Sequence, residues 1–202
     1  MFKFIYILSF IFSFVQIITA QTFEGIVDTR QVGANGISHD ISWFIKKDRI
    51  AFELRSNTDP AGMKMRFVPQ PKQNSMLLVV TTSDGENKTE IHANDINAEI
   101  DMSKAEVREN GIKSSAEYGE ITLLIINTPG TVTETEVSKI IDVNFSRYAS
   151  FFKNDYAVQG LIKSGQSGFP LNSVTKDKSG KVITKTTVIS IRKIPVSESY
   201  FK

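Results

Sequence analysis

The last quarter of the chain, from residue 165 to residue 201, most constrains what this protein can fold into. Residues 171–175 read as a short strand, and residues 181–194 as a long strand dense in Val, Ile and Thr, whose branched side chains fit a pleated sheet. Residues 176–180 between them are charged and include Ser and Gly, as a turn requires. Pro195 ends the second strand because it has no N–H to donate. A hairpin is marginally stable alone, so the rest of the chain must supply a sheet that it joins.

A second hairpin is indicated by strict alternation on both sides of a polar turn. Residues 39–45 and 50–55 alternate between apolar and other side chains, with Phe44 as an apolar exception, and residues 46–49 between them read Lys-Lys-Asp-Arg. Period two of this kind predicts two strands with one buried face. That face consists of Ile41, Trp43, Ile45, Ile50, Phe52 and Leu54.

Further strands are expected at residues 22–30, 63–67, 75–82, 86–92, 120–127 and 156–163. The strand at 75–82 has five consecutive apolar residues, which predicts cover on both of its faces. It ends in Asp84-Gly85, a favourable two-residue turn. The polar strand at 86–92 that follows is expected at an edge of the sheet.

Two helices are expected among these strands. Residues 101–110 form the first, with Asp101 or Ser103 as its cap and Gly111 closing it. Residues 133–153 form the second, where Thr133 and Glu136 have the spacing of a capping box. Its apolar stripe at helical spacing consists of Val137, Ile140, Ile141, Tyr148, Phe151 and Phe152. The fold class that follows is α+β, mainly β: a curved antiparallel sheet, or half-barrel, covered by one or two helices.

The first twenty residues are expected to be a signal peptide. They contain an early Lys3, an apolar run and Ala20, the pattern of a secretory leader. A membrane anchor is the alternative, since the run approaches the ~20 residues that span a bilayer. Cleavage is favoured because a small residue and then polar sequence end the run. Residues 21–202 suit one domain, expected as a monomer in the periplasm or outside the cell and at most peripheral to a membrane.

Composition and motifs exclude several kinds of chemistry. The chain has no Cys, which rules out disulfides and thiol catalysis, and its net charge of +2 gives no reason to expect nucleic acid. Two histidines, His39 and His92, make a weak ligand set, so no metal and no cofactor is predicted. No catalytic or phosphate-binding motif is present, and the protein is predicted not to be an enzyme. The one exception would be an active site built from carboxylates that come together only in the folded protein.

The pattern as a whole resembles a known family. Residues 23–27 (Phe-Glu-Gly-Ile-Val), the hairpin at 43–53, residues 168–171 (Gly-Phe-Pro-Leu) and the final Lys-Ser-Gly turn are similar to an uncharacterised family of exported bacterial proteins. That family, a domain of unknown function common in Bacteroidetes-type organisms, is similar to the lipoprotein-carrier half-barrels LolA and LolB. The resemblance implies an incomplete barrel plugged by helices, with an apolar cavity that holds acyl chains in the carriers. No single Arg corresponds to the carriers' lid-locking residue, and no protruding apolar loop is found.

The aromatic and Met residues are the candidate ligand-binding residues. They would either fill a packed core or line a cavity, where flexible Met side chains suit varied apolar ligands. The predicted function is an exported carrier that holds a lipid or lipoprotein acyl chain between sheet and helical lid. The alternative is a non-catalytic envelope interaction module with a packed core. The candidate residues are Trp43, Phe52, Met63, Met65, Phe67, Tyr148, Phe151 and Phe152.

Overall fold

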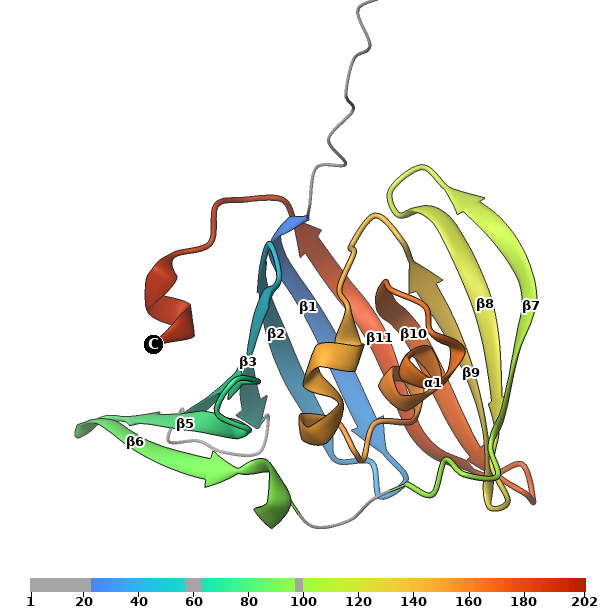
Figure 1. Ribbon diagram of the computed structural model, residues 1–202, viewed down its shortest axis with the longest axis horizontal. Coiled ribbons are helices and arrows are strands. Elements are labelled where there is room, and N and C mark those ends of the chain that lie inside the picture. The colour runs from blue at the N-terminus through green and yellow to red at the C-terminus, as the bar shows by residue number, and fades with distance from the viewer. Residues whose placement is uncertain (1–22, 57–62, 97–99) are drawn as a thin grey trace, which may run out of the picture.

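The computed structural model describes residues 23–56, 63–96 and 100–202. In these residues eleven antiparallel strands form one curved, open sheet in the order β6-β5-β4-β3-β2-β1-β11-β10-β9-β8-β7 (Figure 1). The predicted fold class is therefore confirmed. The strands are β1 (Glu24–Gly33), β2 (Ser38–Lys46), β3 (Arg49–Ser56), β4 (Lys64–Gln70), β5 (Ser75–Thr82), β6 (Gly85–His92), β7 (Glu106–Ser115), β8 (Gly119–Asn127), β9 (Thr131–Ser138), β10 (Phe169–Asp177) and β11 (Val182–Arg192).

The C-terminal hairpin joins a sheet supplied by the rest of the chain, as predicted, and the structure places it in the middle of that sheet. β10 pairs with β11, and β11 pairs with β1, so the last long strand joins the first. The turn between β10 and β11 is held by Asp177, whose Oδ1 accepts hydrogen bonds from the N–H groups of Ser179 (2.8 Å) and Lys181 (3.0 Å). The two halves of the sheet therefore meet along β1 and β11.

Short helices cover one face of this sheet, called the inner face below. The 3₁₀ helix η2 (Phe145–Phe151) and the helix α1 (Tyr156–Ser164) lie over it, and α1 packs against β7, β8, β9 and β10 (Figure 1). The Asp155 side chain caps α1 by accepting from the Val158 N–H, and Gly165 closes it in the left-handed conformation at φ 69°. Two further 3₁₀ turns are η1 (Ala93–Asp95) and η3 (Glu198–Phe201).

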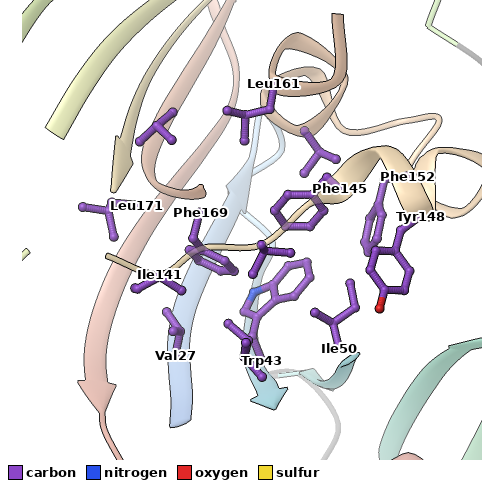
Figure 2. Packing of buried hydrophobic residues seen from close by; sticks show 14 of the residues in the cluster. Val27, Trp43, Ile50, Ile141, Phe145, Tyr148, Phe152, Leu161, Phe169 and Leu171 are labelled. Carbon is purple, nitrogen blue, oxygen red and sulfur yellow. The ribbon is translucent and has the colours of Figure 1, made fainter. Parts of the chain in front are cut away.

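The main core lies between the inner face and these helices. Trp43 is at its centre, with its ring at 5.4 Å from that of Phe169 and 5.8 Å from that of Phe152 (Figure 2). Both pairs are within the range in which aromatic rings attract one another. Apolar residues from β1, β2, β3, β8, β9 and β10 complete the cluster.

A second, smaller core lies on the outer face. The segment after β11 crosses to this face and places Tyr200 flat on Phe44, with ring centroids 3.8 Å apart. Phe201 is buried beside them, and Arg49 lies 4.2 Å above its ring. Phe44, which broke the alternation of its strand, is thus apolar because the C-terminal segment covers it.

The helix predicted over residues 133–153 is wrong in its first part. Residues Thr131–Ser138 are strand β9, in which Thr131, Thr133, Thr135 and Val137 are buried on one face. The Thr133 hydroxyl forms a hydrogen bond with the Thr175 hydroxyl (2.9 Å) rather than capping a helix. β-branched residues at every second position favour a strand, and this outweighed the capping-box spacing. Only residues 145–151 are helical, as η2.

Two more predictions are corrected by the structure. Residues 101–110 do not form a helix: Asp101 holds a local turn through the Ser103 N–H, and the edge strand β7 begins at Glu106. Residues 156–163, predicted as a strand, are the helix α1. The polar strand at 86–92 is confirmed as the opposite edge, β6, although its turn is Ser83-Asp84, one residue earlier than expected.

Candidate functional site: the inner face of the sheet

Two rows of apolar side chains cross the inner face from β2 to β5. Residues directly opposite in antiparallel strands share a face, so the strand register defines each row. The first row runs from Trp43 through Phe52 and Phe67 to Leu78. The second runs parallel to it, through Ile41, Leu54, Met65 and Val80.

The first row is most deeply buried at its Trp43 end. Trp43 is buried under η2, where Phe152 contacts both it and Phe52, at 5.7 Å from the latter. Phe52 stacks on Phe67 at 4.9 Å, and from there outward the side chains are half-buried. We call these half-buried residues the apolar wing: Ile41, Phe52, Leu54, Met65, Phe67, Leu78 and Val80. The wing offers partly exposed apolar surface that continues directly from the core.

The structure brings most of the predicted site residues together. Trp43, Phe52, Phe67 and Phe152 form one aromatic cluster, and Met65 lies in the second row. The other three candidates lie outside this cluster. Tyr148 and Phe151 are buried on η2, and Met63 is half-buried just before β4. Ligand binding by all eight stays a prediction.

Four wing residues were missed by a search for aromatic and Met side chains. They are Ile41, Leu54, Leu78 and Val80, and the alternation of their strands was the signal that could have found them. Aliphatic residues in alternating strands are normally assigned to the core. The structure is needed to show that these four side chains are only half-buried.

A cavity of about 400 Å³ opens where η2 meets the β2–β3 turn. Ile50, Val143 and Tyr148 provide its apolar lining. The Tyr148 hydroxyl donates to the Asp48 carbonyl, and the Asp48 carboxylate pairs with Arg147 at 2.7 Å. The Arg147 guanidinium lowers the pKa of Asp48, and burial raises the pKa of Tyr148. These contacts fix η2 beside the rows.

A group of hydroxyl-bearing side chains lies on the inner face beside the apolar rows. They come from Thr29 on β1, Thr186 on β11 and Ser173 on β10, among others, and surround a small cavity of about 50 Å³ beside the start of α1. Trp43 lines this cavity as well as beginning the first apolar row. The apolar rows and this hydroxyl-lined cavity therefore meet at one side chain, Trp43.

The described residues offer no arrangement typical of a metal centre. Across residues 23–56, 63–96 and 100–202, no three His, Asp or Glu side chains gather as ligands. His39 lies on β2 and His92 at the end of β6, four strands away. In the same part of the chain, no helix is long and apolar enough to cross a bilayer.

Comparison with known proteins supports the fold. No family model and no curated protein matches the sequence, so the family suggested by the sequence is not confirmed. An uncharacterized conserved protein from Thermus thermophilus is similar in structure, with a TM-score of 0.50 at 11% identity over 90% of this chain and 85% of that one. At this identity the likeness shows a shared fold alone.

Weaker structural likenesses point to two other proteins. MucB gives a TM-score of 0.46 at 12% identity, covering 89% of this chain and 57% of that one. A putative outer membrane lipoprotein-sorting protein domain from Vibrio parahaemolyticus gives 0.37 at 7% identity, covering 89% of both chains.

Proposed function

We propose that the protein is an exported carrier that binds the acyl chain of a lipid or lipoprotein along the apolar wing. The observation that supports this is the pair of cross-strand apolar rows: Trp43 is buried at one end of the first row, and the residues of the apolar wing are half-buried. From Ile41 to Val80 the second row crosses three strand spacings, about 14 Å. An extended hydrocarbon chain laid across the strands would cover it.

The binding energy would come from removing this surface from water. Each roughly 100 Å² of apolar surface that a ligand covers contributes about 2.5 kcal/mol before the cost of ordering the ligand. Met65 is unbranched and flexible, so it can adapt to chains of different shape. The stacked rings of Phe52 and Phe67 are rigid, whereas Met65 beside them is flexible. This combination suits a class of apolar ligands rather than one molecule.

A matched pair of substitutions on β4 tests the proposal. Met65→Gln preserves side-chain length but puts a polar amide on the inner face, whereas Lys64→Gln puts the same residue on the outer face one position earlier. Trp43, the only Trp of the chain, lies beside the wing and reports binding by its fluorescence. We expect Met65→Gln to weaken binding of methyl laurate roughly fivefold to tenfold, and Lys64→Gln to leave it unchanged.

The natural ligand is identified by native mass spectrometry of protein purified gently from its own envelope fraction, with lipid extraction of the same sample. A stoichiometric lipid or acylated peptide supports the carrier. A clean apo mass that persists after incubation with envelope lipids contradicts it. That result would favour the interaction module, for which the exposed edge strand β6 is the candidate contact.

A further inference from the structure

The hydroxyl-lined cavity contains polar side chains that no described residue engages. Thr184 and Thr186 on β11 and Gln31 on β1 line the 50 Å³ cavity, are half-buried, and make no side-chain hydrogen bond to any described residue. Their neighbours differ: the Thr29 hydroxyl accepts from the Trp43 indole at 3.2 Å, and Thr133 pairs with Thr175. Thr184, Thr186 and Gln31 can therefore donate and accept hydrogen bonds to a ligand in the cavity.

The cavity also selects by charge. No Lys or Arg is among the described residues that line it, and the only carboxylate there is Asp155. A carboxylate or phosphate group would find no opposite charge and would approach Asp155. At about 50 Å³ the space has room for on the order of three water molecules, which suits one or two hydroxyl groups.

This cavity and the apolar wing are adjacent across a single strand pair. Thr29, in the cavity wall, lies directly opposite Ile41, the first residue of the second apolar row. Trp43 borders both regions, and its ring lies 5.1 Å from Phe52. A molecule with a small polar end and a hydrocarbon chain could place the end against Thr29 and the chain along Leu54 and Met65.

We propose that the hydroxyl-lined cavity is a headgroup subsite for a neutral, hydroxyl-bearing amphiphile, such as a monoacylglycerol, whose chain lies on the apolar wing. This assignment rests on the proposed function, since it names the class of ligand that the same inner face selects. The ligand's hydroxyl groups would hydrogen-bond to the hydroxyls of Thr184 and Thr186. Anionic fatty acids are disfavoured because the described residues that line the cavity include no Lys or Arg.

The experiment compares three ligands that share one chain. Glycerol monolaurate, methyl laurate and laurate are titrated into the full-length mature protein below their micelle concentrations, with Trp43 fluorescence as the readout. We expect glycerol monolaurate to bind most tightly and laurate least. In the double variant Thr184→Val, Thr186→Val, glycerol monolaurate should lose roughly threefold to tenfold in affinity, the effect of one ordinary hydrogen bond. Methyl laurate should bind this variant as it binds the wild type.

The control is Thr187→Val, the same change on the same strand at an exposed position facing the other way. It should leave all three affinities unchanged. Equal binding of the three ligands by the wild type, or an equal loss of methyl laurate and glycerol monolaurate in the double variant, overturns the headgroup subsite and leaves the carrier proposal standing. Failure of the wild type to bind any of the three instead overturns the carrier proposal itself.

Discussion

Asp155 illustrates how one residue links the start of α1 to the chemistry of the inner face. Its carboxylate caps the helix through the Val158 N–H at 3.0 Å, and it also lines the hydroxyl-lined cavity. Burial raises the pKa of Asp155 despite the backbone N–H groups of Ala157 and Val158, which act in the opposite direction. The charged form is therefore the costly one in the folded protein.

We predict that this cost appears as a pH dependence that Asp155→Asn removes. Because the folded pKa lies above the unfolded value of about 3.9, the folded state holds the proton longer, and stability falls as pH rises between the two values. Asn also caps helices but does not titrate. Urea denaturation across this range should show the variant gaining stability relative to wild type as pH rises. A difference that is constant with pH would contradict the assignment.

At the scale of elements, the packing of α1 on β8 depends on a glycine, Gly160, at the point of contact. A Cβ at Gly160 would lie 2.3 Å from Cδ1 and 2.5 Å from Cγ1 of Ile126, a buried residue of β8. Gly normally weakens a helix interior by about 1 kcal/mol relative to Ala. Its presence here shows that the contact with the sheet outweighs helix propensity.

Gly160→Ala should therefore destabilise the protein, by roughly 1–3 kcal/mol, although it favours the helix. The steric origin is tested with Ile126→Ala, which removes both contacting atoms. Introduced into that background, Gly160→Ala should cost less free energy of unfolding than in the wild type, as measured by urea denaturation. Equal costs in both backgrounds would mean that the clash is not the cause.

The elements that the sequence failed to predict are those in which two patterns competed. In β9, a Thr-x-x-Glu spacing and helically spaced apolar residues predicted a helix, but Thr133 and Thr135 pair with hydroxyls of β10. In α1, Asp155 before and Gly165 after the segment were helix boundary signals that the strand prediction overlooked. Local residue spacing cannot decide between helix and strand in these segments, because the choice depends on which strands are available to pair with them.

At the scale of the whole molecule, fold class could be predicted because strict alternation recurs in strands far apart in sequence. The candidate site could be predicted only in part. Phe52 and Met65 were recognisable as candidates by residue type, but their partial exposure depends on how far η2 covers the inner face. The hydroxyl-lined cavity had no sequence signal, since Thr residues in strands are common for reasons of propensity alone.

The C-terminal segment closes the molecule on its outer face, opposite the proposed site. The Val196 N–H donates to the Glu24 carboxylate at 2.8 Å, and Arg49 pairs with Glu198 at 2.6 Å. Phe201 is 8% exposed in the outer core. The segment thus joins the last residues of the chain to strands β1 and β3, and the stability of the whole sheet should depend on it.

Phe201→Ala should destabilise the protein by about 3 kcal/mol, because it empties a buried aromatic position. For a chain of this size that corresponds to a fall in melting temperature of roughly 6–12 °C. Lys202→Ala, at the exposed neighbouring position, is the control and should not change it. Because the outer core lies across the sheet from the apolar wing, Phe201→Ala should still bind methyl laurate with wild-type affinity at temperatures where it is folded. An unchanged melting temperature would show that the C-terminal segment rests on the sheet without stabilising it, and a lost affinity would show that the two faces are coupled.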